Sequence, residues 1–106
     1  MKKIQQVIAL REVSGDLVDG KHFYDFIEPG VGDYFWDSIM ADMKSLLLYG
    51  GIHQRMHGLY RMPAKRFPYS IYYTMEQSNV YVVAVLPMRR SPHGIVQTLT
   101  GRTKAT

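Results

Sequence analysis

The segment VYVVAVL, residues 80–86, restricts the fold of this chain more than any other. Its side chains are almost all apolar, and four of the seven are valine, which is typical of a central strand in a sheet. The preceding segment YSIYYTM, residues 69–75, alternates like a strand, and EQSN after it predicts a turn. One face of this strand carries Tyr69, Ile71, Tyr73 and Met75, and the other carries Ser70, Tyr72, Thr74 and Glu76.

Two helices are predicted before these strands. The first follows Ser14, a suitable N-cap, and Asp16 in its first turn suits the positive end of a helix. The Pro-Gly pair at 29–30 ends the first helix, and the Gly-Gly pair at 50–51 ends the second. Two helices joined by a short turn form a hairpin.

Each predicted helix has one apolar face at helical spacing. These faces should pack on the apolar side of the sheet. The face of the first helix consists of Leu17, Gly20, Tyr24 and Ile27, and that of the second consists of Phe35, Ile39, Met43 and Leu46. The opposite face of the second helix carries Asp33, Asp37, Ser38, Asp42 and Lys44. The sheet positions expected beneath the helices are Tyr69, Ile71, Tyr73, Val82 and Ala84.

Two further strands complete the predicted fold. Residues 4–10 favour a first strand, and LYRMPAK, residues 59–65, predicts another that Pro63 restricts to an edge or a bulge. IHQRMHG, residues 52–58, reads as a loop, and the tail after His93 as a short helix or a frayed end. The prediction is one α+β domain over residues 1–106, in the order β-α-α-β-β-β, with a helical hairpin on one face of a small antiparallel sheet.

Charge is divided unevenly along the chain. Residues 14–48 carry seven acidic side chains and two cations, whereas residues 49–106 carry eight cations and one acid. This division indicates an acidic helical layer and a basic working surface. The chain has no cysteine and no apolar stretch long enough to span a membrane. We therefore expect a cytoplasmic protein.

A basic cluster is the main candidate site. It consists of Arg61, Lys65, Arg66, Arg89, Arg90 and His93. Arginine suits phosphate, and Tyr72, expected on the same sheet face as Arg61, could stack on a base. The alternative is a solvated sheet face whose cations oppose edge-to-edge pairing. The residues alone favour neither interpretation.

Other kinds of chemistry are not indicated. The chain lacks a P-loop, a G-x-S-x-G elbow and a G-x-G-x-x-G motif. His53 and His57 have the i, i+4 spacing of metal ligands on a helix, but they follow a Gly-Gly break and have no evident third ligand. No metal or cofactor is expected.

The order of elements, the stretch KRFPYSIYY and the apolar strand followed by RRSP closely resemble the RelE/ParE family of type II toxin-antitoxin toxins. The resemblance covers about residues 4 to 95. It implies a growth-inhibitory toxin of a plasmid-stabilisation type of module, bound in a hetero-oligomer by a cognate antitoxin that is usually encoded by the adjacent gene. It also implies that Lys65 and Arg66 border a groove for an anionic target or the antitoxin.

The family resemblance leaves three activities open. A ParE-like toxin inhibits DNA gyrase, and the absence of a tyrosine after Tyr81 favours this branch. A RelE-like toxin is a metal-independent endoribonuclease that cleaves ribosome-bound mRNA, and its catalytic candidates here are Arg61, Arg66, Arg90 and His93. A degenerate member would only bind antitoxin. On either toxin reading, the target-binding candidates are Arg61, Lys65, Arg66, Tyr72, Arg89 and Arg90.

Overall fold

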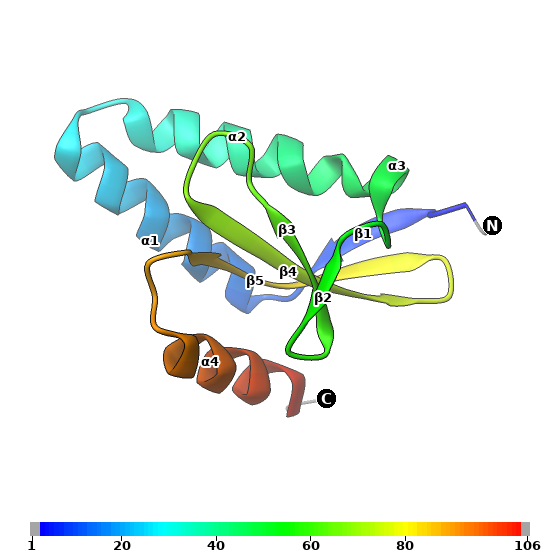
Figure 1. Cartoon of the computed structure of the whole chain (residues 1–106). Coiled ribbons are helices and arrows are strands. Elements are labelled where there is room, and N and C mark those ends of the chain that lie inside the picture. Colours follow the sequence, from blue (N-terminus) through cyan, green and yellow to red (C-terminus); the bar gives the residue numbers. More distant parts are fainter. Residues whose placement is uncertain (1–2, 105–106) are drawn as a thin grey trace.

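A computed structural model describes residues 3–104 of the chain (Figure 1). A helical hairpin lies on one face of a five-stranded sheet, and a C-terminal helix lies on the other. The elements in chain order are β1 (Gln6–Ala9), α1 (Glu12–Ile27), α2 (Val31–Lys44), α3 (Leu46–Tyr49), β2 (Gln54–Met56), β3 (Leu59–Pro63), β4 (Tyr69–Glu76), β5 (Asn79–Pro87) and α4 (Pro92–Lys104). Within the described range, no helix has the length and apolar character needed to cross a membrane.

The sheet has the strand order β1-β5-β4-β3-β2. Strands β2 to β5 form an antiparallel meander, which confirms the predicted α+β class. Two details differ from the sequence prediction. β1 pairs with β5 in parallel, with Gln6 opposite Asn79, and the segment expected to be a loop contains the short edge strand β2.

The hairpin packs on the sheet through the faces predicted for its two helices. Phe35, Ile39 and Leu46 are fully buried, together with Ile71 and Tyr73 of β4. α1 and α2 approach closely where α1 has a glycine. A Cβ atom on Gly20 would lie 2.4 Å from the ring of Phe35, so only glycine allows this crossing.

Several predicted positions on the hairpin are wrong. Ile27 is 63% exposed because it lies in the last turn of α1, at the free end of the hairpin. Ser14 is not the N-cap: the helix begins at Glu12, and the Ser14 hydroxyl donates to the carbonyl of Arg11. Ser38 and Asp42, assigned to the solvent face of the second helix, are buried.

The prediction that Ala84 lies beneath the hairpin is also wrong. A bulge interrupts the β4–β5 ladder, since Tyr72 pairs with Ala84 and Tyr73 pairs with Val82. Val83 is therefore an extra residue, and it shifts the following side chains to the opposite face. Val82 packs under the hairpin, whereas Ala84 packs with Tyr72 on the other side of the sheet.

α4 covers the second face of the sheet. Ser91 begins the helix: its hydroxyl accepts the N–H of Gly94 at 3.1 Å, and Pro92 occupies the first helical position, where proline is favoured. Leu99 is buried, and Ile95 packs beside it. The sheet residues beneath them are Leu59, Tyr72, Val83, Ala84 and Leu86.

A largely buried ion pair fastens α4 to the rest of the fold. Both oxygens of Asp16 in α1 accept hydrogen bonds from the Arg102 guanidinium, at 2.6 and 2.7 Å. The side chains are only 9% and 16% exposed, respectively. Asp16 also accepts the N–H of Val85, and Arg102 also donates to the carbonyl of Val83. The pair thus joins α1, β5 and α4, and its hydrogen bonds raise the pKa of Arg102.

A column of side chains fixes the β2–β3 ribbon to β4. The ring of Tyr60 stacks on Tyr73 with centroids 5.1 Å apart, and the Arg55 guanidinium lies over Tyr60. The Tyr73 hydroxyl accepts the N–H of Gly51 at 2.8 Å and lies 2.6 Å from Nδ1 of His53. The direction of the hydrogen bond between Tyr73 and His53 is set by the tautomer of His53.

Ile39→Ala will lower the free energy of unfolding by about 2–5 kcal/mol, because it opens a cavity at a position with no solvent exposure. Chemical denaturation followed by circular dichroism measures the change. The control is Met40→Ala on the same helix, where the side chain is 47% exposed and the loss should be small. Equal losses in the two variants would mean that the helix face is assigned incorrectly.

Stability will fall as the pH drops through the ordinary histidine pKa of 6.5, because burial lowers the pKa of His53 in the folded protein. The unfolded chain then binds the proton more tightly than the folded one, so acid favours unfolding. Melting temperatures at about pH 7.5 and 5.5 test this. His53→Gln, which keeps a hydrogen-bonding partner for Tyr73, should reduce the pH dependence.

Candidate functional site

Two of the basic segments lie next to each other at one end of the sheet. The β3–β4 loop, residues 64–68, precedes β4, and the elbow, residues 88–91, follows β5. Tyr69 pairs with Pro87 where the two strands meet these segments. The N–H of Met88 in the elbow donates to the carbonyl of Pro68 in the loop at 2.9 Å. The fold therefore brings the Lys-Arg and Arg-Arg pairs of the sequence to the same end of the molecule.

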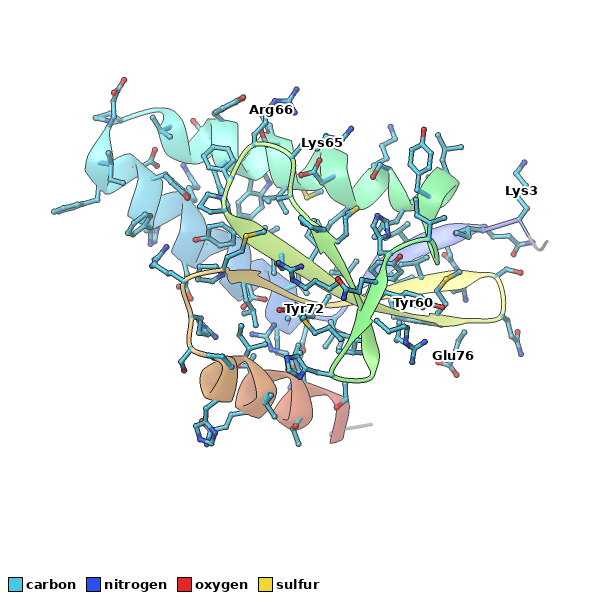
Figure 2. All side chains as sticks on the ribbon, viewed as in Figure 1. Lys3, Tyr60, Lys65, Arg66, Tyr72 and Glu76 are labelled. Atoms are coloured by element: carbon cyan, nitrogen blue, oxygen red, sulfur yellow. The ribbon has the colours of Figure 1, made fainter. Side chains whose placement is uncertain are left out.

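The β3–β4 loop is held against α2. The buried carboxylate of Asp42 accepts the N–H of Lys65 at 3.1 Å. Phe67 packs edge-on against Tyr24 and Phe35, with centroids 4.8 and 5.2 Å away. With the backbone fixed in this way, the side chains of Lys65 and Arg66 are exposed at the tip of the loop beside α2 (Figure 2).

The elbow exposes both of its arginines. The Arg89 guanidinium lies over the ring of Phe23 at 4.4 Å from the centroid, and Arg90 donates to the hydroxyl of Thr98 in α4 at 3.2 Å. Neither arginine forms an ion pair with a carboxylate of residues 3–104. Asp33 instead pairs with Lys21, at 2.8 Å. Both arginines of the elbow are therefore exposed and without an ion-pair partner among residues 3–104.

A small cleft of about 200 Å³ separates the elbow from α1. Arg89 and Arg90 lie on one side of it, and Asp16 and Asp19 of α1 lie on the other. Tyr69 forms part of the wall; burial raises the pKa of its hydroxyl, and the nearby Arg89 opposes that rise. The cleft is thus lined by both acidic and basic residues, and its size suits a single side chain rather than a nucleotide.

Arg61 and Tyr72 lie opposite each other on β3 and β4, as the sequence predicts. Since Tyr60 and Met62 face the hairpin, Arg61 between them faces α4. That face is not open. Arg61 is half-buried, and Tyr72 is 2% exposed beneath α4 (Figure 2). In this arrangement a base cannot stack on Tyr72.

The four candidate nuclease residues do not form one cluster. His93 is exposed in the first turn of α4, three residues after Arg90. Arg61 lies on β3, the strand next to the β2 edge, on the side of the sheet that faces α4. Arg66 lies on the hairpin side, next to α2 (Figure 2). Only Arg90 and His93 come from the same segment.

The two histidines with metal-ligand spacing have separate places. His53 hydrogen-bonds to Tyr73, and His57 occupies a left-handed turn between β2 and β3, with φ of 57°. In the part of the chain that the structure describes, no three His, Cys, Asp or Glu side chains converge as metal ligands would.

Sequence reasoning left the tail as either a short helix or a frayed end, and it missed both the packing of α4 over the sheet and the Asp16–Arg102 pair. Ser91-Pro92 is an N-cap followed by a first-turn proline, a local signal that predicts a helix start. Ile95 and Leu99 then recur at i, i+4 on one face. No comparable signal links Asp16 with Arg102, because the contact depends on the tertiary fold.

No family model and no curated protein matches this chain. Five chains of solved structures do. One of them, from a structure of the chromosomal ParDE TA system from P. aeruginosa, aligns with a TM-score of 0.71 and 14% sequence identity, over 83% of this chain and 100% of that chain. The two chains share a fold. That fold is found in a toxin–antitoxin system, which agrees with the resemblance carried by KRFPYSIYY and RRSP.

Proposed function

We propose that this protein is the toxin of a type II toxin–antitoxin module and acts in the cytoplasm until a cognate antitoxin binds it. The observation that carries this proposal is the fold shared with a chain of a ParDE system. The order of basic and aromatic motifs along the sequence supports it independently. Fold alone does not define a function, so the proposal also depends on the exposed basic elbow described above.

The proposed target is a type II topoisomerase such as DNA gyrase, as for ParE-like toxins. Arg89 and Arg90 are exposed and form no ion pair in the described structure, so they can contact an acidic surface. Two observations support protein binding over RNA cleavage. Arg61 lies on the α4 side of the sheet and Arg66 lies beside α2 on the hairpin side, and Tyr72 is covered by α4.

The alternative is a RelE-like, metal-independent endoribonuclease that acts on ribosome-bound mRNA. One observation favours it: Arg90 in the elbow and His93 in the first turn of α4 are both exposed and only three residues apart in the sequence. Histidine can exchange a proton with a ribose 2′-OH near neutral pH, and arginine can stabilise the charge that develops on the phosphate. A third possibility is a member that has lost its activity and only binds antitoxin.

The proposed antitoxin contacts the basic end of the sheet with an acidic segment and forms a hetero-oligomer with the toxin. Lys65 and Arg66, which border the groove that the family resemblance implies, are exposed there. Complementary charge would speed encounter and favour the correct partner. Co-expression with the product of the adjacent small reading frame should therefore give a complex that co-purifies.

Controlled induction of this gene, with and without its neighbour, tests the proposal. We expect growth to stop when the gene is induced alone and to recover when the neighbour is induced with it. DNA damage without transcript cleavage would support a topoisomerase target, and cleavage of ribosome-bound transcripts would support the nuclease alternative. Normal growth together with a stable complex would indicate a protein that only binds antitoxin. Normal growth without a complex would contradict the proposal.

A further inference from the structure

An apolar patch covers the last turn of α1, at the free end of the hairpin. Its members are Phe23, Phe26 and Ile27, which are 42%, 92% and 63% exposed. Residues three and four apart are neighbours on a helix surface, so Phe26 and Ile27 both adjoin Phe23. Exposed apolar side chains that lie together mark a contact site, whereas single ones need no explanation. We call these three side chains the tip patch.

The turn that carries the tip patch is braced from both helices. The carboxylate of Asp25 in α1 accepts the N–H of Gly32 in α2 at 2.7 Å. Lys21 joins Asp25 to Asp33, at 3.0 and 2.8 Å. A Cβ atom on Gly32 would lie 2.4 Å from the carbonyl oxygen of Lys21, so the two helices are in close contact here. The tip patch is therefore held in place before a partner binds, which reduces the entropy cost of binding.

The tip patch adjoins the basic elbow. The Arg89 guanidinium lies over the ring of Phe23, 4.4 Å from its centroid. Figure 1 shows the hairpin turn extending beyond the end of β5, where the elbow begins. The cleft of about 200 Å³ between the elbow and α1 continues the patch, because Phe23 lines both. Exposed rings, a cleft for one side chain and two arginines thus form one surface.

The charges around the tip patch favour a protein over a nucleic acid. Arg89 and Arg90 lie on the elbow side of the patch and have no ion-pair partner among residues 3–104. Asp19 lines the cleft, and Glu28 is exposed directly after the helix. A nucleic acid carries phosphates along its whole length, so these two carboxylates would repel it. A protein can place carboxylates opposite the two arginines alone.

The tip patch is too small to hold two copies of this chain together. A buried aromatic side chain contributes about 150–250 Å². Three side chains therefore supply less than the roughly 800 Å² per partner that a stable interface buries. The patch fits instead as the anchor of a larger contact, in which a few buried aromatic and arginine side chains contribute most of the binding energy.

We propose that the tip patch and the elbow together dock onto a helix of a partner protein, one that has an apolar stripe with carboxylates beside it. One apolar side chain of that helix enters the cleft, the rest of the stripe packs on the tip patch, and the carboxylates face Arg89 and Arg90. Resting on the proposed function, we assign this helix to the target of the toxin. The antitoxin is proposed to bind at Lys65 and Arg66, which lie beside α2 instead (Figure 2).

A synthetic helix tests this docking surface without a target. The probe is a peptide of about sixteen residues, based on Ala and Gln, with a stripe of Leu and two Glu beside it. The comparison peptide has Lys in place of Glu. In ¹⁵N NMR titrations, the Glu peptide should shift the amides of residues 22–27 and 88–91 with a Kd of about 1 mM or tighter. The Lys peptide should bind at least about fivefold more weakly.

Two variants locate the contact. Phe26→Ser should weaken binding of the Glu peptide by at least about fivefold. Leu48→Ser on α3 also removes a strongly exposed apolar side chain, one that is 79% exposed, and should bind like the wild-type protein. No binding at about 1 mM, equal binding of the two peptides, or shifts confined to other residues would overturn the proposal. Tighter binding of a single-stranded oligonucleotide at the same amides would overturn it as well, as would self-association that Phe26→Ser abolishes.

Growth assays test the assignment to the target. Phe26→Ser should lose growth inhibition and still co-purify with the antitoxin, whereas Leu48→Ser should remain toxic. If Phe26→Ser is fully toxic, the assignment to the target fails and the proposed function stands. If the wild-type chain neither stops growth nor forms a complex with the neighbouring product, the proposed function fails. The peptide titration then decides whether the tip patch binds an acidic helix.

Discussion

Arg102→Ala will lower the free energy of unfolding by up to about 3 kcal/mol, because it leaves the largely buried carboxylate of Asp16 without its charged partner. In a domain of this size that is a large part of the total stability. Urea denaturation followed by circular dichroism measures the loss. Arg66→Ala, which removes the same charge from an exposed position, should change stability by less than about 0.5 kcal/mol.

The double variant Asp16→Leu with Arg102→Met gives a sharper test of the same pair. Removing both charges leaves no unpaired ion in the interior, so this variant should be more stable than either Arg102→Ala or Asp16→Leu alone. If Arg102→Ala is as stable as the wild-type protein, the ion pair does not hold α4 against the sheet. If the double variant loses the sum of the two single losses, the two residues act independently.

Arg89→Ala with Arg90→Ala will abolish growth inhibition while leaving the fold and antitoxin binding largely intact. The stability cost is small, because the contact of Arg89 with Phe23 and the hydrogen bond of Arg90 to Thr98 both involve exposed arginines. The loss of toxicity is expected because these two charges are free to contact a target. Growth after induction and co-purification with the antitoxin are the two measurements.

The matched control for the elbow is Arg11→Ala with Arg55→Ala. It removes the same net charge from exposed positions at other places on the molecule. This control should remain toxic. Full toxicity of the elbow variant would show that residues 88–91 are only a solvated turn and that the target binds elsewhere. Loss of toxicity in both variants would point to total charge rather than to the elbow.

The sequence was sufficient to predict the hairpin, the meander and the packing between them. Phe35, Ile39 and Leu46 recur at helical spacing and are buried, because a long periodic pattern reflects which side of a helix meets the core. Local patterns failed where a tertiary contact decides burial. Asp42 has the periodicity of a solvent-facing residue, but it is buried because it accepts the N–H of Lys65, a residue distant in sequence.

The candidate site was predictable in composition but not in geometry. The Lys-Arg and Arg-Arg pairs could be identified because they flank two strongly patterned strands. The position of these pairs relative to Tyr72 could not be predicted. The helix that covers Tyr72 has a weak amphipathic pattern, and it docks through the contact of Arg102 with Asp16. The bulge at Val83 could not be predicted either, because assigning alternate side chains to opposite faces of a strand assumes an unbroken ladder of paired residues.

The parallel pairing of β1 with β5 has a consequence for how the chain folds. β1 is made early, but its partner residues 79–82 are made only after both hairpin helices and three other strands. Until then, β1 has no neighbouring strand, and the sheet on which the apolar face of the hairpin packs is incomplete. Long-range pairings of this kind slow folding and leave strand edges exposed for longer. During synthesis, the backbone N–H and C=O groups of β1 would therefore stay unpaired, and open to pairing with another strand, until β5 has been made.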